Sequence, residues 1–344
     1  MAQPAKTITF VIPAYNMQSY LERCVSSLLA ARDTSDIEVL IVDDGSKDGT
    51  LAHAQELEHR HPGIVRAIHQ ENKGHGGAVN TGIAAACGAY VKVVDADDWV
   101  GPESLELVMA TLRAEVGGDD PIDMLVTNYV YDKVDKRTKH VVNFRHAMKA
   151  GERLGWDDLG HFGLAEYILM HALVFRTEVV RASGMQLPEH TFYVDFIYAY
   201  QPFPWVKTIK YLDTPFYHYF IGREGQSVQT QVMVKRVDQL RLVNQRMVEA
   251  TPERGTVPDG LYRYMIHFLA IESSVASVFM ILSRDPANYA KKRQMWADIE
   301  AYSPSIYHDV RKRPMSVALN LPGSAGRFII RHGYTVAKYF IGFN

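Results

Sequence analysis

The chain has 344 residues, enough for one large domain or two smaller ones with a sizeable core. Its apolar content of 47% and charged content of 22% are ordinary for a globular protein, and a net charge of −2 argues against nucleic acid as a partner. Cys24 and Cys87 lie in apolar, helix-like segments, so we expect small core side chains rather than a disulfide. No signal peptide is expected at residues 1–6, and no uninterrupted apolar run has membrane-spanning length, which predicts a cytoplasmic protein.

Strands and helices alternate along the N-terminal part of the chain. Predicted strands cover residues 7–12, 37–42, 64–68 and 90–94. The segments between them have helical spacing, as in Leu21, Cys24, Val25 and Leu28, and further helices are predicted at 50–61 and 78–87. Such alternation predicts right-handed crossovers and an α/β fold, with a mostly parallel, Rossmann-like sheet covered by helices on both faces.

Polar clusters follow three of the predicted strands, at residues 13–16, 43–44 and 95–98. The carboxyl ends of parallel strands meet at one edge of the sheet, where ligands bind. The last cluster places three carboxylates close together, at Asp95, Asp97 and Asp98, and their repulsion is relieved when a cation neutralises them. Oxygen ligands of this kind suit Mn²⁺ or Mg²⁺. The alternative is a solvated acidic turn that caps the following helix.

Two known phosphate-binding motifs compete as explanations of this pattern. A P-loop is excluded because the chain has no Gly-x-x-x-x-Gly-Lys-Ser/Thr. The glycines of residues 74–77 open a predicted helix, but Val79 stands where a dinucleotide fingerprint needs its third glycine. Neither motif therefore explains the polar edge.

Five motifs follow one another along the first hundred residues: Val11-Ile12-Pro13-Ala14-Tyr15-Asn16, Val42-Asp43-Asp44-Gly45-Ser46-Lys47-Asp48-Gly49-Thr50, Asn72-x-Gly74, Asn80-x-Gly82 and Asp95-Ala96-Asp97-Asp98. In this order they resemble family 2 glycosyltransferases with the GT-A fold, of the bacterial cell-surface polysaccharide or glycolipid type. The resemblance implies an inverting enzyme that transfers a hexosyl or N-acetylhexosaminyl group from a nucleotide-diphosphate sugar, expected to be UDP-linked. The implied acceptor is a hydroxyl of a glycan, glycolipid or envelope polymer.

The resemblance also assigns residues to the nucleotide. It implies that Pro13, Ala14 and Tyr15 line the pocket of the base. It further implies that Asp43 hydrogen-bonds the base and that Asn72 contacts the nucleoside.

The remaining donor contacts concern the diphosphate and its cation. Asp95, next to Ala96 in the donor site, matches a ribose or metal contact, and Asp97 matches the metal-binding carboxylate. The implied Mn²⁺ or Mg²⁺ neutralises the diphosphate and stabilises it as a leaving group. Many members carry an arginine where this chain has Val79, so this diphosphate contact is expected to be either missing or supplied by Lys73 or His75.

A general base is needed to take the proton from the acceptor hydroxyl. The segment at residues 188–196 resembles the one in which the family carries this base, and Asp195 matches the base itself, with Val194 in place of the preceding acid. Its aromatic neighbours predict partial desolvation and a raised pKa. The alternative is a helix N-cap or an ion-pair partner of Arg176 or Lys207. His171, in a predicted strand nearby, is interpreted as a structural histidine.

The end of the catalytic domain is marked by a loop and a change of pattern. Arg223 lies in a stretch resembling a loop that covers the donor in related enzymes, and a guanidinium suits a diphosphate; a solvated turn is the alternative. Beyond it the spacing is helical, at 232–248, 261–282 and 287–302. We therefore expect a catalytic domain over residues 1–227 and a helical region over 228–344.

The C-terminal 34 residues, 311–344, contain basic residues and no Asp or Glu. On a helix starting near Ser324, one face carries basic residues and the opposite face apolar ones: Arg327, Arg331 and Lys338 against Ile329, Val336 and Phe340. Such a helix either docks on the helical region by its apolar face or lies on an anionic membrane. Peripheral contact with the inner face of the cell membrane fits a lipid-linked acceptor.

Two functions agree with these patterns. The first is an active, metal-dependent sugar transferase, and the second is a noncatalytic module that binds a nucleotide sugar or glycan on the same fold. Because Asp95, Asp97 and Asp195 are all present, the sequence favours the enzyme.

Overall fold

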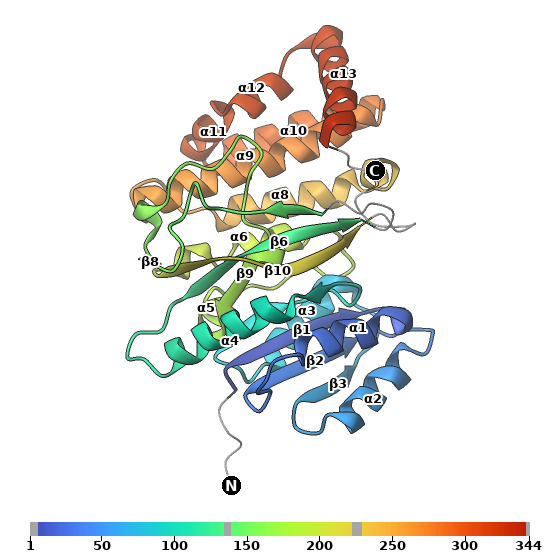
Figure 1. The fold of residues 1–344 in the computed structure, drawn as a ribbon. Helices are drawn as coiled ribbons and strands as arrows, with labels where there is room; N and C mark the ends of the chain where they lie inside the picture. The colour runs from blue at the N-terminus through green and yellow to red at the C-terminus, as the bar shows by residue number, and fades with distance from the viewer. Residues whose placement is uncertain (1–5, 134–138, 222–228, 342–344) are drawn as a thin grey trace. The chain divides into compact units, whose positions relative to one another are not determined.

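The computed structural model describes residues 6–133, 139–221 and 229–341 (Figure 1). The chain forms two compact units: the first contains residues 1–161 and 168–221, and the second contains 162–167 and 222–344. The boundary expected between residues 227 and 228 falls in a stretch outside the described residues and stays a prediction.

The first unit is built on a ten-stranded sheet with the main order β3-β2-β1-β4-β9-β6-β10-β5, in which β7 pairs with β6 and β8 with β10. The strands are β1 (Ile8–Ala14), β2 (Ile37–Asp43), β3 (Val65–His69), β4 (Tyr90–Val93), β5 (Trp99–Val100), β6 (Met124–Lys133), β7 (His140–Val142), β8 (Arg153–Leu154), β9 (Leu173–Arg176) and β10 (Ile209–Ile221).

The α/β fold is confirmed, and the sheet is mixed. Strands β3, β2, β1 and β4 are parallel neighbours, as the alternating pattern predicts. Strand β9 runs antiparallel to both β4 and β6, so it separates the parallel run from β3 to β4 from the parallel pair of β6 and β10. Ala14 pairs with Asp43, and Val11 pairs with Val93. The polar clusters that follow β1, β2 and β4 therefore lie at the same edge.

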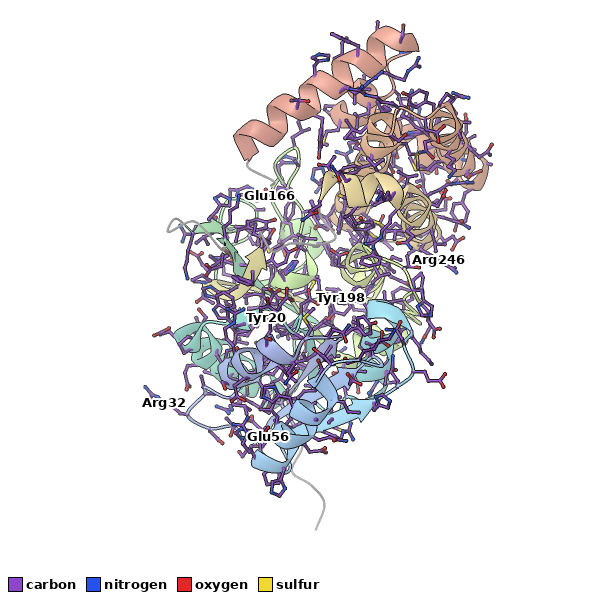
Figure 2. All side chains as sticks on the ribbon, turned by 90° about the vertical axis from the view of Figure 1, so that its right-hand side faces the viewer. Tyr20, Arg32, Glu56, Glu166, Tyr198 and Arg246 are labelled. Atoms are coloured by element: carbon purple, nitrogen blue, oxygen red, sulfur yellow. The ribbon has the colours of Figure 1, made fainter. Side chains whose placement is uncertain are left out.

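Helices fill the connections of this unit: α1 (Gln18–Leu28), α2 (Thr50–Arg60), α3 (Gly74–Ala85), α4 (Pro102–Val116), α5 (Thr177–Ala182) and α6 (Asp195–Tyr200), with short 3₁₀ turns η1 (Trp156–Asp158), η2 (Met170–Ala172) and η3 (Phe203–Trp205). Helix α1 buries the four residues predicted from its spacing. Figure 2 shows Tyr198 of α6 inside the unit and Arg32 and Glu56 at its edge; Tyr198 is fully buried.

The two cysteines have different surroundings. Cys24 is buried on α1, as expected. The expectation of a buried Cys87 is wrong, because α3 ends at Ala85 and Cys87 follows it as an exposed residue. Neither cysteine forms a disulfide.

The second unit is helical, as predicted, with α7 (Thr230–Lys235), α8 (Val237–Ala250), α9 (Asp259–Leu282), α10 (Pro286–Tyr302), α11 (Pro304–Arg311), α12 (Pro314–Leu319) and α13 (Gly323–Ile341). Helix α9 contacts every one of the others. It is long and apolar enough to cross a membrane by length and composition, with a mean hydropathy of 1.9, but 78% of that window is buried inside the structure. This burial is what the core helix of a bundle shows.

Helix α13 packs on other helices of the second unit through Ile330, which contacts a cluster formed by Ile281, Leu319 and Val278. The expected docking residue Ile329 is instead 57% exposed, and its neighbour Phe328 is 59% exposed. Residues one position apart on a helix point about 100° apart, so burying Ile330 turns Ile329 outward. The side chains of Val336, Lys338 and Phe340 lie outside the described ones.

Candidate functional site

Asp43 ends β2, and only one of its two carboxylate oxygens has a hydrogen-bond partner among the described residues. Asp43 is fully buried, and its Oδ2 lies 2.7 Å from His69 Nδ1. Its Oδ1 has no hydrogen-bond partner among the described residues. A buried carboxylate oxygen normally has a donor, so this atom is chemically suited to accept a hydrogen bond from a bound base. Tyr15, directly after β1, is 41% exposed at the same edge of the sheet.

The next residue, Asp44, fastens the loop between β3 and α3. Its Oδ1 accepts hydrogen bonds from Gln70 Nε2 at 2.7 Å and from the backbone N–H of Lys73 at 2.8 Å. Its backbone carbonyl accepts one from Asn72 Nδ2 at 2.8 Å. The side-chain amide of Asn72, predicted to contact the nucleoside, thus also holds this loop against β2.

Two glycines let another segment lie directly on the start of α3. Gly74 has a φ of +74°, and a Cβ there would lie 2.8 Å from the backbone nitrogen of His190. A Cβ on Gly76 would lie 2.6 Å from the carbonyl oxygen of Pro188. His190 itself donates its backbone N–H to the carbonyl of Lys73 at 2.8 Å. Glycine is therefore needed at both positions because the two backbones approach so closely.

Asn80 fixes the same segment from the middle of α3. Its Nδ2 donates to the carbonyl of Leu187 at 2.9 Å, and its Oδ1 accepts from the N–H of Leu187 at 3.0 Å. Farther along, His190 and Tyr193 have φ values of 50° and 65°, which are uncommon for residues other than glycine. The segment anchored in this way leads into Asp195, the first residue of α6.

Asp195 lies in an electrostatic cluster with His75 and Asp95. Burial, helped by the charge of Asp95, raises the pKa of Asp195 to about 6, although the charge of His75 opposes this rise. His75 Nε2 lies 2.8 Å from Asp95 Oδ1. Burial lowers the pKa of His75, but the hydrogen bond with Asp95 and the nearby carboxylates outweigh it and leave that pKa raised.

The alternative roles of Asp195 find little support. Arg176 pairs with Asp123 at 2.8 Å, and none of the described ion pairs joins Asp195 to Arg176 or Lys207. The N-cap position of α6 is taken by Val194. A partly buried carboxylate with a raised pKa and without an ion-pair partner of this kind is typical of a functional site.

Asp95, Asp98 and His171 form a group that could hold a cation, with possible ligand atoms within 4.8 Å of one another. Burial lowers the pKa of His171 to about 4, so its imidazole is neutral at ordinary pH. Its buried Nδ1 has no hydrogen-bond partner among the described residues. Two carboxylates and a neutral imidazole with a free nitrogen fit Mn²⁺ in donor type.

Asp98 also has a structural role that the sequence did not indicate. Its Oδ2 accepts a hydrogen bond from Tyr217 Oη at 2.5 Å, and its Oδ1 accepts one from the backbone N–H of Phe220 at 2.8 Å. Both donors belong to β10, so Asp98 holds that strand. Burial and the charge of Asp95 raise the pKa of Asp98 well above its ordinary value.

Asp97, predicted as the metal-binding carboxylate, is 8% exposed, and its carbonyl oxygen accepts a hydrogen bond from Arg23 at 2.6 Å. It is not one of the three residues of the group above. Its assignment to the metal stays a prediction. Ala96, between the two carboxylates, is buried.

A lysine lies buried beneath this cluster, on β4. Lys92 Nζ donates to the carbonyls of His171 at 2.8 Å and Leu173 at 3.1 Å. Burial lowers the pKa of Lys92 to about 7, against the charges of Asp95 and Asp98. A lysine inside an apolar strand pattern is the signal that could have revealed it.

The basic residues predicted to contact the diphosphate differ in how closely they pair with a carboxylate. His75 is engaged by Asp95, whereas Lys73 Nζ lies 3.7 Å from Glu189 Oε1 with both side chains about half exposed. Arg223 lies outside the described residues, and its assignment stays a prediction. Pro13 and Ala14 are buried at the end of β1.

Comparisons with known proteins identify similar sequences and similar folds. Residues 9–163 match the profile of glycosyl transferase family 2. The chain is 43% identical over 109 residues to the chondroitin synthase of Escherichia coli, which covers 32% of this chain and 16% of that protein. It is 38% identical over 135 residues to the glycosyltransferase GlyG of Streptococcus pneumoniae, covering 38% of this chain and 42% of that protein.

Solved structures show the same fold at low sequence identity. The crystal structure of residues 1–349 of TarS from S. aureus matches with a TM-score of 0.66 and 17% identity, over 95% of this chain and 91% of that one. TarS has also been solved with UDP-GlcNAc. The mannosyltransferase PcManGT from Pyrobaculum calidifontis, solved with GDP-Man and Mn²⁺, matches with a TM-score of 0.53 and 16% identity, over 91% of this chain and 85% of that one. The chain is therefore similar to glycosyl transferase family 2 over residues 9–163, it spans less than two thirds of the length of these curated relatives, and the solved structures share its fold.

Proposed function

We propose that this protein is a metal-dependent, inverting glycosyltransferase that moves a sugar from a UDP-linked donor to a hydroxyl of an envelope glycan or glycolipid. The observation that carries the proposal is the cluster of Asp195, His75 and Asp95 at the end of β4, with the pKa of Asp195 raised to about 6. TarS in complex with UDP-GlcNAc supports a UDP-linked donor, and the complex of PcManGT supports Mn²⁺ as the cation.

The nucleotide end of the donor is assigned to the edge formed by β1 and β2. The free Oδ1 of Asp43 accepts a hydrogen bond from the base, and the exposed ring of Tyr15 packs against it. Asp44 holds the loop that carries Asn72, so the nucleoside meets a preformed surface. Preformed contacts of this kind lower the entropy cost of binding.

The sugar end of the donor is assigned to the end of β4. Asp95 and Asp97 are the carboxylates proposed for the cation, and Asp98 and His171 Nδ1 offer further candidate ligand atoms. When bound, Mn²⁺ or Mg²⁺ neutralises charge on the diphosphate leaving group. His75 pairs with Asp95 and holds its carboxylate in one orientation.

Asp195 is proposed as the general base. In its ionised form it accepts the proton of the acceptor hydroxyl while the oxygen attacks the anomeric carbon and the diphosphate leaves, which inverts the configuration. A pKa near 6 leaves Asp195 mostly ionised at neutral pH, yet makes it more basic than an ordinary aspartate. Burial is the main cause of this basicity.

The proposal is tested by incubating the protein with UDP- and GDP-linked sugars, with Mn²⁺ or with excess chelator, and measuring nucleotide release and the anomeric configuration of the product. We expect release from a UDP-linked donor only with the metal, and an inverted product. Saturable donor binding without turnover in any mixture of donors and glycan acceptors would instead support a noncatalytic nucleotide-sugar-binding module.

Two carboxylate variants distinguish Asp97, proposed only as a metal ligand, from Asp98, which also holds β10. Asp97→Ala is expected to lose metal-dependent UDP binding in calorimetry and to keep its thermal midpoint. Asp98→Ala is expected to lower the free energy of unfolding by about 2–4 kcal/mol, because two buried donors of β10 lose their acceptor. Unchanged UDP affinity in Asp97→Ala would reject the assignment of Asp97 to the metal.

A further inference from the structure

Two cavities adjoin in the helical unit and share Arg313 and Pro314 as lining residues. One has a volume of about 260 Å³ and the other of about 680 Å³. Every residue that lines them belongs to the second unit. The donor site described above uses none of these residues.

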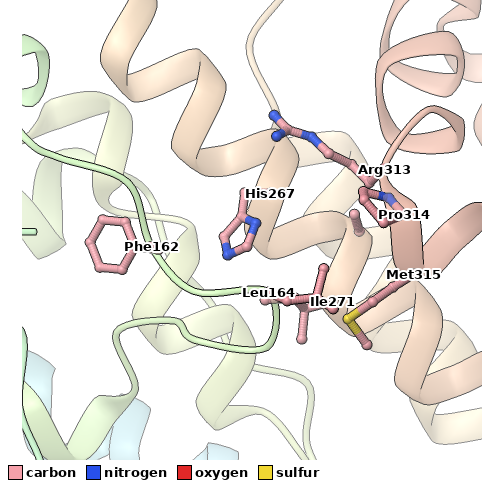
Figure 3. Close-up of a pocket in the computed structure, with 8 residues that line it drawn as sticks. Phe162, Leu164, His267, Ile271, Arg313, Pro314 and Met315 are labelled. Atoms are coloured by element: carbon pink, nitrogen blue, oxygen red, sulfur yellow. The ribbon is translucent and has the colours of Figure 1, made fainter.

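The smaller cavity is mainly apolar. Figure 3 shows Leu164, Ile271 and Met315 close together, with Arg313 and His267 beside them. Leu164 comes from the segment 162–167, which is held against α9 because His267 Nε2 lies 2.8 Å from the carbonyl oxygen of Glu166. The cavity is therefore an apolar recess with a cation at its border.

The larger cavity is cationic. Its lining includes four cations and two carboxylates: Arg254, Arg263, Lys312, Arg313, Asp259 and Asp309. Asp309 is already engaged, because its Oδ2 accepts from Tyr262 Oη at 2.9 Å and lies 3.1 Å from a guanidinium nitrogen of Arg254. The excess of positive charge favours an anionic ligand.

Arg313 lines both cavities. Its guanidinium is partly buried and donates to the backbone carbonyl of Arg263 at 3.2 Å. Among the described ion pairs, none includes Arg313. Burial and the charge of Arg263 lower the pKa of Arg313, while the charge of Asp309 opposes this change. A desolvated cation beside a second one is stabilised by a bound anion.

We propose that these adjoining cavities bind a phosphate-bearing amphiphile of the kind that a single lipid phosphate provides, with the phosphate at Arg313 and the first part of the apolar chain against Leu164 and Met315. A guanidinium can donate two parallel hydrogen bonds to a phosphate, and the additional cations Arg263 and Lys312 suit its remaining charge. The apolar recess next to the phosphate position removes methylene groups from water. The site is separate from the proposed donor site and does not depend on glycosyl transfer.

The test uses isothermal titration of the full chain with inorganic phosphate and with ethyl, butyl, hexyl and octyl phosphate, each below its critical micelle concentration. We expect the dissociation constant to fall about three- to fourfold with each added methylene until the recess is filled. Arg313→Gln is expected to weaken binding of every phosphate at least about tenfold. Leu164→Gln and Met315→Gln are expected to flatten the dependence on chain length and to leave ethyl phosphate binding unchanged.

The matched control is Arg246→Gln, which removes a charge from the same unit at the exposed side chain on α8 that Figure 2 labels. It is expected to bind as the unmodified protein does. If Arg313→Gln fails to fold, as judged by circular dichroism, the exposed Lys312→Gln takes its place, with a smaller loss of affinity for every phosphate. Equal affinity in the cation variants, the same affinity for inorganic and octyl phosphate, or equal binding of octyl glucoside would each overturn the proposal.

Discussion

The pKa of Asp195 makes the proposed reaction sensitive to pH. Its carboxyl titrates near pH 6 because burial disfavours the charged form. Above that pH Asp195 is ionised and can take the proton of the substrate hydroxyl. Below that pH Asp195 is protonated and cannot take it. We therefore expect kcat/KM to fall tenfold per pH unit below about 6, a trend measured with the unmodified protein between pH 5 and 8.

The corresponding variant is Asp195→Asn, which keeps the size of the side chain but cannot accept the proton. Turnover is expected to fall about 10²–10⁴-fold while UDP affinity in calorimetry stays within about twofold. Glu189→Gln, an exposed substitution in the same segment, serves as the control and should keep its activity. A loss of nucleotide affinity in Asp195→Asn with turnover largely retained would make Asp195 a binding residue instead.

Individual residues differ in how far the sequence could predict them. Asp43 and Asp195 stand in recognisable motifs, and their roles stay predictions; the structure shows an Asp43 Oδ1 without a partner among the described residues and a raised pKa for Asp195. The positions of Lys92 and His171 depend on β9 running beside β4, a pairing between distant segments that no local pattern encodes. The same holds for Asp98, whose partners in β10 lie more than a hundred residues along the chain.

Helix α9 carries a buried carboxylate that links the stability of the helical unit to pH. Glu272 is fully buried, and its Oε2 accepts a hydrogen bond from Asn244 on α8 at 2.6 Å. Its Oε1 has no partner among the described residues. Burial raises the pKa of Glu272 to about 8, with the bond to Asn244 opposing the rise. Between about pH 4.5 and 8 the folded state therefore holds a proton that the unfolded state releases.

It follows that the free energy of unfolding decreases as pH rises from about 4.5 to 8. Glu272→Gln removes the titration and keeps an acceptor for Asn244. Relative to the unmodified protein, this variant is expected to gain little at pH 5 and about 2–4 kcal/mol at pH 8, measured by urea unfolding at both values. Glu300→Gln, an exposed change on α10, should show no such gain. Equal effects of Glu272→Gln at both pH values would contradict the raised pKa.

The elements themselves were predictable where their pattern was strong. The parallel strands β1 to β4 and the long helices α8, α9 and α10 follow from periodicity alone, whereas the short helices α11 and α12 were not predicted. The second half of the sheet was harder, because β9 and β5 have only four and two residues and take their direction from neighbours far away in sequence. On α13, the apolar residues span more than one face, so periodicity did not distinguish Ile330 from Ile329 as the docking residue.

The C-terminal part of the chain combines exposed apolar side chains with the absence of acidic ones. Val317, Leu321, Phe328 and Ile329 on and between α12 and α13 are each 41–59% exposed, and residues 311–344 contain no Asp or Glu. We propose that this surface gives the protein peripheral contact with anionic membranes, where exposed apolar residues insert and basic ones are attracted. A membrane-bound position would suit a lipid-linked acceptor.

This contact is tested by flotation with phosphatidylglycerol-containing liposomes. The double variant Phe328→Ser/Ile329→Ser is expected to lose most of the floating fraction, because two side chains that would insert among the lipids become polar. Leu107→Ser, which alters an apolar residue on α4 that is 45% exposed, should float as the unmodified protein does. The proposal fails if the unmodified protein does not float, or if both variants float to the same extent as it does.

The hydrogen bonds at the start of α3 have a thermodynamic consequence. Asp44 holds the backbone N–H of Lys73, and the carbonyl of Lys73 holds the segment that leads to Asp195. Lys73 thus joins the loop proposed to bind the nucleoside to the segment that leads to Asp195, the proposed general base. If nucleotide binding shifts this loop, the position of the base shifts with it, and the two binding events share a coupling free energy. Such coupling is reciprocal. If bound nucleotide increases the affinity for the acceptor, bound acceptor must increase the affinity for the nucleotide by the same factor.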